Sequence, residues 1–288
     1  MPPSQKLSDI SAIFHSFTKE ADGFNPDIVK EKLGIKIGTT PETISAKQLP
    51  SPELQLGKRD KIDDFKVTNF QLFNKQLYSP DVSLRISIIC PTETDLTEAK
   101  NVMNSTSKNL GLYLSIVPQH IKFGEPRQTL KSIEDIIEKE SKKKESANIF
   151  WFIIPNSFKT NYSKLKKMVL KKNIERNSQI TLTTTMQKKG FQSIVTKILL
   201  QMSAKVGNKL WVPKVSNKLS SSGVLMIGIE NYGVQENKSM NVISFCSNSD
   251  REFSEFHSNY IVHQKNDTKT HMNKIVFSCF TEYYRCNG

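Results

Sequence analysis

The stretch Ile149-Phe150-Trp151-Phe152-Ile153-Ile154-Pro155 is one of the two longest apolar runs of the chain, and a proline closes it. A short apolar run of this kind is typical of a strand that is buried on both faces of a parallel sheet. Residues 84–90 (Leu-Arg-Ile-Ser-Ile-Ile-Cys) first alternate and then become apolar, as the buried strand of a sheet does. The two runs therefore predict two strands of a sheet.

Further helix and strand patterns surround these two runs. The spacing of apolar residues predicts helices over residues 95–110, 128–144, 162–172 and 191–205, and strands over residues 112–117 and 179–184. Strands that alternate with helices are typical of an α/β fold with a parallel sheet. We therefore predict such a domain over residues 77–212.

The segments on either side of this domain have different patterns. Residues 1–76 contain a predicted helix over 7–17 and short extended pieces at 35–37, 43–45 and 54–56 among prolines, so we expect a linker that packs on another part of the molecule. Residues 213–288 contain predicted strands at 224–230, 241–247 and 258–262 and a predicted helix at 269–285. These elements are too few to close a core of their own, so we expect an exposed sheet edge and a tendency to aggregate.

The chain is basic, and its positive charge is concentrated in one window. Its 288 residues include 41 Lys and Arg against 28 Asp and Glu, which gives a formal net charge of +13. Residues 156–220 contain fourteen basic residues and one acidic residue, Glu175, and so account for the whole excess. This concentration favours a polyanionic partner such as a nucleic acid. A Lys-rich composition with solvated faces is the alternative.

Composition also excludes several classes of protein. All apolar runs are far shorter than the about 20 residues that cross a bilayer, so we expect no membrane partner. Four widely scattered cysteines exclude a disulfide-rich scaffold and fit a reducing compartment, so we expect a cytoplasmic or nuclear location. The spacing of His263, His271, Cys279 and Cys286 does not match a zinc site.

Five polar side chains form the candidate site. Tyr162 and Lys166 lie four residues apart on a predicted helix and so share a face, as do Gln201 and Lys205 on another helix. Gln179 opens the predicted strand between the two helices. We expect the five to converge at the carboxyl edge of the sheet, where ligands bind in open α/β folds. A tyrosine ring, two ammonium groups and two amides suit a terminal phosphate with its adjoining base.

Three runs of the sequence resemble the guide-binding MID domain of Piwi-clade Argonautes. They are residues 162–166 (Tyr-Ser-Lys-Leu-Lys), 177–179 (Asn-Ser-Gln) and 197–207 (Lys-Ile-Leu-Leu-Gln-Met-Ser-Ala-Lys-Val-Gly), with Leu210-Trp211 close behind. In that family a Tyr, a Lys, two Gln and a further Lys hold the 5′ phosphate of a small guide RNA. The resemblance implies this role for Tyr162, Lys166, Gln179, Gln201 and Lys205. The glutamine at 201 points to the Piwi side of the family, where a Mg²⁺ can help to bridge the phosphate.

The resemblance extends over nearly the whole chain. Residues 16–19, 33–37 and 49–54 are similar to the linker that precedes the MID domain, and residues 226–230 stand where the PIWI nuclease domain opens. The implied architecture is a linker over residues 1–76, a Rossmann-like MID domain with a parallel sheet over 77–212, and a truncated RNase H-like PIWI segment over 213–288.

The nuclease chemistry of the family is only partly matched. Its cutting centre holds two Mg²⁺ ions on acidic residues, and the first acidic position is Glu230 here, where the family has Asp. Glu252 and Glu255 lie near another acidic position without a clear match, and we expect the chain to end before the later ligands. We therefore expect a guide-RNA-binding chain in RNA-mediated gene silencing, in which target RNA is recognised by guide pairing if the remainder of the protein is present. The alternatives are a fragment of a longer slicer endonuclease and a decayed paralogue that binds no guide.

Overall fold

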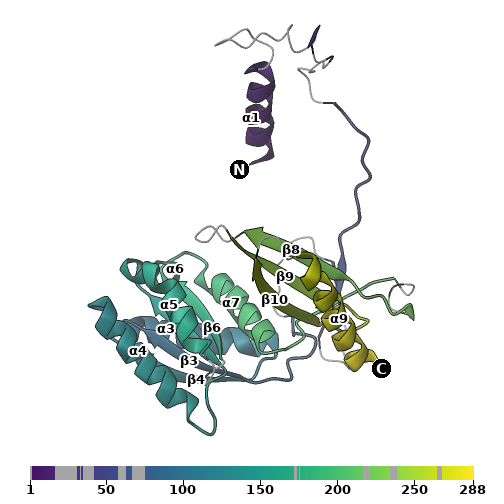
Figure 1. Ribbon diagram of the computed structural model, residues 1–288. Coiled ribbons are helices and arrows are strands. Elements are labelled where there is room, and N and C mark those ends of the chain that lie inside the picture. Colours follow the sequence, from purple (N-terminus) through teal and green to yellow (C-terminus); the bar gives the residue numbers. More distant parts are fainter. Residues whose placement is uncertain are drawn as a thin grey trace. The chain divides into compact units, whose positions relative to one another are not determined.

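The computed structural model describes residues 2–16, 31–32, 34, 42–57, 63–66, 75–171, 174, 176–216, 219, 221–233, 239–264 and 268–288 (Figure 1). The chain divides into two compact units, Met1–Pro50 and Ser51–Gly288. The first unit contains helix α1 (Pro3–Ser16), which confirms the predicted N-terminal helix. The extended piece predicted at residues 43–45 is not a strand, and the piece at 35–37 lies outside the described residues.

A four-stranded parallel sheet forms the centre of the second unit. Its strand order is β4-β3-β5-β6. The strands are β3 (Leu84–Cys90), β4 (Leu114–His120), β5 (Ile149–Ile154) and β6 (Asn177–Leu182). All six residues of β5 are buried, as the apolar run predicts, and neighbouring strands pair in parallel. Because β6 is an edge strand, its outer backbone edge is open to side chains from the helices beside it.

Helices cover both faces of this sheet. They are α3 (Glu93–Leu110), α4 (Pro126–Ser141), the 3-10 helix η1 (Asn156–Asn161), α5 (Tyr162–Val169), α6 (Thr183–Met186) and α7 (Phe191–Lys205). On one face α3 and α7 pack together over Trp151, and on the other α4 and α5 pack over Phe150 and Phe152. The alternation of β5 side chains thus fills two separate cores, and the predicted α/β fold with a parallel sheet is confirmed.

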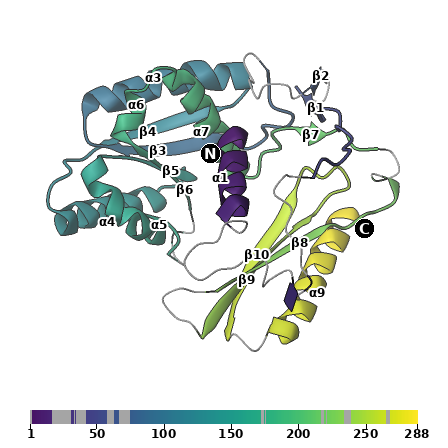
Figure 2. The same ribbon diagram turned by 90° about the horizontal axis from the view of Figure 1, so that it is seen from above.

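A second, smaller sheet has antiparallel strands in the order β10-β9-β8. Its strands are β8 (Ile227–Gly233), β9 (Met240–Asn248) and β10 (Phe256–Gln264), and helix α9 (Thr268–Asn287) packs on one face (Figure 2). We call these four elements the antiparallel unit. Ile243 and Phe245 of β9 and Ile275 and Cys279 of α9 form its small buried cluster. The predicted pairing of the first two strands is confirmed, although β8 continues three residues beyond Glu230.

A short sheet joins the segment before the parallel sheet to the segment after it. Strand β1 (Glu53–Leu56) pairs with β2 (Asp63–Lys66) on one side and with β7 (Val212–Pro213) on the other, all antiparallel. Leu56 is buried in the same core as Trp151, so the segment before the parallel domain packs on it. Within the described part of the chain, no helix combines the length and the apolar character that crossing a membrane requires.

Candidate nucleic-acid interface

The two predicted lysines meet at one backbone carbonyl. The Nζ of Lys166, on α5, donates to the carbonyl oxygen of Ser178 at 3.1 Å. The Nζ of Lys205, the last residue of α7, donates to the same oxygen at 2.8 Å. Ser178 is the second residue of the edge strand β6. Two helices that lie on opposite faces of the sheet therefore bring their ammonium groups together beside its open edge.

The two predicted glutamines extend this cluster. Lys205 also donates to Oε1 of Gln179 at 2.7 Å, and Nε2 of Gln179 donates to Oε1 of Gln201 at 2.9 Å. The fifth predicted residue, Tyr162, lies beside Lys166, whose Nζ is 5.8 Å from the centre of its ring. All five predicted side chains are thus linked through contacts between neighbours. We call them the five-residue cluster.

The position of this cluster differs from the predicted one. The contacts lie along the outer edge of β6, level with its second and third residues, and not beyond the carboxyl ends of the strands. The reason is the direction of α7. A helix that follows a parallel strand runs back along the sheet, so its last residue, Lys205, returns toward the start of β6.

Burial and like charge shape the electrostatics of the cluster. Burial lowers the pKa of Lys166, and both burial and the charge of Lys166 lower the pKa of Lys205. Among the residues that the structure describes, no carboxylate forms an ion pair with either ammonium group. Two half-buried cations next to each other favour an anion with more than one negative charge.

Two supporting contacts escaped the sequence analysis. The side chain of Asn177 donates to the carbonyl oxygen of Lys205 at 2.9 Å and so fastens the end of α7 to the start of β6. The acceptor that Lys166 and Lys205 share is a backbone group of Ser178. Every residue carries such a carbonyl, so no residue type could have indicated it. Tyr162 is 49% exposed and places an aromatic ring at the rim of the cluster.

The cluster offers little to a metal ion by itself. Its neutral oxygen donors are amides, and the ammonium groups of Lys166 and Lys205 lie among them. Mg²⁺ is usually bound through carboxylates together with phosphate oxygens. These side chains alone therefore do not form a Mg²⁺ site. A Mg²⁺ at Gln201 would require the oxygens of a bound phosphate as its other ligands.

The acidic positions predicted for nuclease chemistry lie apart from this cluster. Glu230 is exposed in the middle of β8, opposite Ser244, and not at the end of its strand as expected. The strand continues because Asn231, Tyr232 and Gly233 pair with β9 despite their turn-like sequence. In the described ranges, no three His, Cys, Asp or Glu side chains are grouped so as to hold a metal ion.

The comparisons with known proteins agree with one another. Residues 149–288 match the model of the Piwi domain. The chain is 28% identical over 125 residues to Protein argonaute-3 of Drosophila melanogaster, an alignment that covers 43% of this chain and 14% of that protein. It is 26% identical over 128 residues to Piwi-like protein Ago3 of Bombyx mori, an alignment that covers 44% of this chain and 13% of that protein. The matched part is thus a small fraction of these relatives.

Solved structures show the same fold. The crystal structure of Drosophila Piwi matches with a TM-score of 0.69 at 15% identity, over 99% of this chain and 39% of that one. A. aeolicus Argonaute matches with a TM-score of 0.66 at 18% identity, over 98% and 39%. Kluyveromyces polysporus Argonaute with a guide RNA matches with a TM-score of 0.62 at 15% identity, over 83% and 32%.

The chain therefore has the fold of the MID and PIWI parts of Argonautes, with a Rossmann-like parallel domain followed by an RNase H-like segment. Within this class, the Piwi-domain match and the two Ago3 relatives confirm the resemblance to the Piwi clade.

Proposed function

We propose that this chain binds the 5′ phosphate of a small guide RNA in RNA-guided gene silencing, in the cytoplasm or the nucleus. The observation that supports this proposal most strongly is the meeting of Lys166 and Lys205 at the Ser178 carbonyl, where no described carboxylate pairs with them. A 5′-terminal phosphate carries up to two charges and three acceptor oxygens. It would neutralise the repulsion between the two ammonium groups, which a singly charged phosphodiester does only in part.

The five-residue cluster supplies complementary contacts to such a terminal group. The two ammonium groups would donate charge-assisted hydrogen bonds to phosphate oxygens, and the amide groups of Gln179 and Gln201 would donate further ones. The exposed ring of Tyr162 would stack on the first base, a contact that tolerates any base. Each charge-assisted bond contributes about 1.5–3 kcal/mol, so several together would select RNA by the chemistry of its end.

The wider partners of the proposal follow from its relatives. One structural neighbour is an Argonaute crystallised with a guide RNA and another is Aa-Ago with externally bound siRNA. By analogy, we infer that a guide RNA held here would recognise a target RNA by base pairing, in a protein that also contains the parts beyond this chain. Mg²⁺ is proposed as an accessory ion that joins Gln201 to the bound phosphate.

Binding to paired RNAs tests the proposal directly. The affinity of the chain is measured by filter binding for two RNAs of the same sequence, one with a 5′ phosphate and one with a 5′ hydroxyl. We expect at least about tenfold tighter binding of the phosphorylated RNA, the equivalent of one charge-assisted contact. Lys164→Ala is the matched control, because Lys164 is an exposed lysine of the same helix. This substitution should lower the affinity for both RNAs by the same factor. Equal affinity of the unmodified chain for the two RNAs would reject the proposal.

A second candidate function is that of a slicer endonuclease of which this chain is one part. The RNase H-like fold of the antiparallel unit and the exposed acidic Glu230 favour it. Cleavage of a guide-paired target in the presence of Mg²⁺, lost on Glu230→Gln, would support this function. Guide binding without cleavage would leave RNA binding alone.

A further inference from the structure

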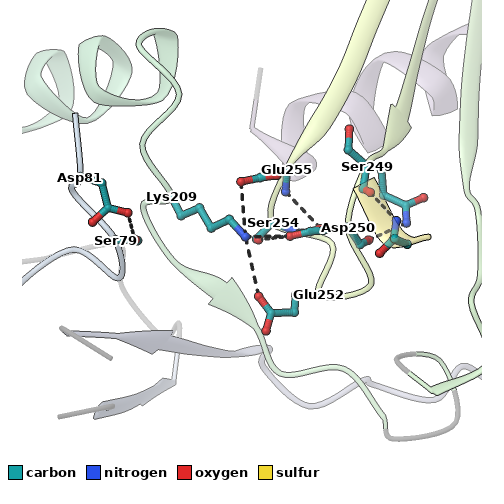
Figure 3. A network of polar contacts seen from close by, with 10 residues as sticks. Ser79, Asp81, Lys209, Ser249, Asp250, Glu252, Ser254 and Glu255 are labelled. Carbon is teal, nitrogen blue, oxygen red and sulfur yellow. Dashed lines mark hydrogen bonds and ion pairs between the residues drawn. The ribbon is translucent and has the colours of Figure 1, made fainter. Parts of the chain in front are cut away.

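A single lysine connects the parallel domain to the antiparallel unit through three carboxylates (Figure 3). The Nζ of Lys209 lies 3.2 Å from Oδ2 of Asp250, 3.4 Å from Oε1 of Glu255 and 3.9 Å from Oε2 of Glu252. The side chains of Lys209 and Asp250 are 21% and 15% exposed, so this ion pair is largely shielded from water. Shielded pairs of this kind are stronger than those on the surface.

Asp250 also organises the turn between β9 and β10. Its Oδ1 accepts hydrogen bonds from the backbone N–H groups of Ser254 at 2.9 Å and Glu255 at 3.2 Å, and Oδ2 accepts from the Ser254 hydroxyl. Within this turn Phe253 has a φ of 55°, a left-handed conformation that is unfavourable for a bulky residue. The turn therefore depends on the carboxylate that Lys209 contacts.

Hydrogen bonds hold both sides of this contact to neighbouring segments. On one side, the carbonyl oxygen of Lys209 accepts from the N–H of Ser79 at 3.0 Å, and Asn208 exchanges two hydrogen bonds with the backbone of Val82. On the other side, the side chain of Asn248 holds the start of the turn and that of Asn287 holds its Ser249 carbonyl. Each side of the contact is thus held by hydrogen bonds in addition to the ion pairs of Lys209.

The charges of the contact are unbalanced. Burial lowers the pKa of Lys209, but its hydrogen bonds and attraction to Asp250 and Glu255 raise it more, and the net shift is upward. Burial raises the pKa of Asp250, whereas hydrogen bonds from Ser254, Glu255 and Lys209 lower it more. One ammonium group therefore faces three carboxylates. Without that ammonium group, the carboxylates would repel one another and loosen the turn.

This contact lies close to the five-residue cluster. Lys209 is four residues beyond Lys205, and the segment between them is held by hydrogen bonds from Gly207 and Asn208 back to the last turn of α7. A cavity of about 500 Å³ opens beside it, lined on one side by Ala204, Lys209 and Trp211 and on the other by Glu255, Glu282 and Arg285. The end of α7 and the antiparallel unit thus face one cavity.

We propose that Lys209 is a positioning residue that couples phosphate binding at the five-residue cluster to the turn at residues 249–256. The inference rests on the proposed function. A bound phosphate would relieve the repulsion between Lys166 and Lys205, fix the last turn of α7 and so hold Lys209 among its carboxylates. Such coupling is reciprocal. If RNA binding stabilises the turn by a certain factor, loss of the Lys209 contact removes that stabilisation and lowers the affinity for RNA by the same factor.

Hydrogen exchange of residues 249–256 tests the coupling, because the Ser254 and Glu255 amides report on the turn directly. We expect 5′-phosphorylated RNA to slow their exchange at least about fivefold in the unmodified chain, the lower range of typical coupling. Lys209→Met should abolish this slowing and lower RNA affinity by the same factor, and Lys209→Arg should restore both. Lys214→Met is the matched control, since Lys214 forms its ion pair with Glu53 of β1, and it should retain the slowing.

Other outcomes separate the coupling from the proposed function. The coupling is wrong, and the proposed function stands, if RNA slows hydrogen exchange equally in Lys209→Met and in the unmodified chain. The same holds if RNA slows exchange in neither chain while the unmodified chain still prefers 5′-phosphorylated RNA. If the unmodified chain shows no preference for 5′-phosphorylated RNA, both the coupling and the proposed function are wrong. If Lys209→Met does not fold, Glu255→Gln replaces it, since it removes one carboxylate contact and keeps the backbone bonds of the turn. The slowing should then be reduced, and undiminished slowing overturns the coupling.

Discussion

Lys166 and Lys205 lie close enough for the charge of Lys166 to disfavour that of Lys205. Their ammonium groups share an acceptor, and the charge of Lys166 contributes to the lowered pKa of Lys205. An arrangement that is unfavourable in isolation becomes favourable once a dianion binds between the two groups. On the proposed function, the same two residues would give the site its selectivity for a terminal phosphate.

The 5′-phosphate preference should depend on pH at both ends of the range. Below about pH 6 the terminal phosphate loses its second charge, so the preference falls. On the alkaline side, binding requires both lysines to be protonated, and their pKa values lie below the ordinary 10.5. The preference should therefore decline before pH 10.5 is reached. Affinities for the two RNAs across this range measure it, and a ratio that does not change with pH would contradict this electrostatic origin.

Gln201 should determine any effect of Mg²⁺ on binding. If the ion joins this amide to a bound phosphate, removal of Mg²⁺ with EDTA lowers the affinity for 5′-phosphorylated RNA and leaves that for 5′-hydroxyl RNA unchanged. Gln201→Leu should remove the Mg²⁺ effect, because the amide oxygen is lost. An effect of EDTA that is equal for both RNAs, or that persists in Gln201→Leu, would show that the ion acts elsewhere.

At the scale of elements, strand β6 carries the site and depends on its neighbour β5. The indole Nε1 of Trp151, fully buried in β5, donates to Oγ1 of Thr181 in β6 at 2.9 Å. This bond lies two residues beyond Gln179 along β6. The edge strand is thus anchored to the core by a side-chain hydrogen bond as well as by its backbone pairing.

Thr181→Val should destabilise the chain by about 1–3 kcal/mol, because it keeps the shape of the side chain but leaves the buried indole N–H without an acceptor. Urea denaturation followed by fluorescence measures the change in the free energy of unfolding. Thr184→Val is the control at an exposed position of the following helix and should change stability by no more than about 0.5 kcal/mol. Equal effects of the two substitutions would mean that the Trp151 contact contributes nothing.

The larger elements could be predicted from the sequence, and the reasons are local. The spacing of apolar residues predicts the bounds of α7, 191–205, because a helix buried on one face has apolar residues at regular intervals. The apolar run 149–154 predicts β5, because a strand buried on both faces is apolar throughout. The sequence analysis did not predict helices η1 and α6, because one or two turns are too short to show a period. The five polar residues could be selected by type and spacing, but their place along the edge of β6 depends on the direction of α7.

The Lys209 contact shows a different limit. Lys209 and Asp250 are separated by 41 positions, one in the segment after α7 and the other in the turn after β9. Neither residue belongs to a motif, and charged side chains are common throughout the chain. Only the packing of the antiparallel unit against the segment after α7 brings them together.

At the scale of the whole molecule, the described chain leaves much apolar surface exposed on the antiparallel unit. Strands β8 and β10 are both edge strands. Tyr232 and Tyr260 on these strands are 56% and 65% exposed, and Phe277 on α9 is 74% exposed. Free strand edges beside apolar side chains promote association.

We therefore expect the 288-residue chain to self-associate with rising concentration. Sedimentation velocity measures the self-association. The double substitution Tyr260→Lys and Phe277→Glu should shift the chain toward the monomer, because it places one charge on β10 and one on α9 at exposed apolar positions. Leu7→Lys, an exposed position of α1 in the other compact unit, serves as a control for charge alone. A monodisperse and protease-resistant chain would contradict the expectation.

The central claim is that Lys166 and Lys205 together recognise a terminal phosphate, and the double variant Lys166→Ala/Lys205→Ala tests it most directly. The measurement is the ratio of dissociation constants for 5′-hydroxyl and 5′-phosphorylated RNA, in the unmodified chain and in the double variant. We predict a ratio of at least about ten in the unmodified chain and a ratio close to one in the double variant, with the protein still folded. A ratio that survives the loss of both lysines would contradict the account.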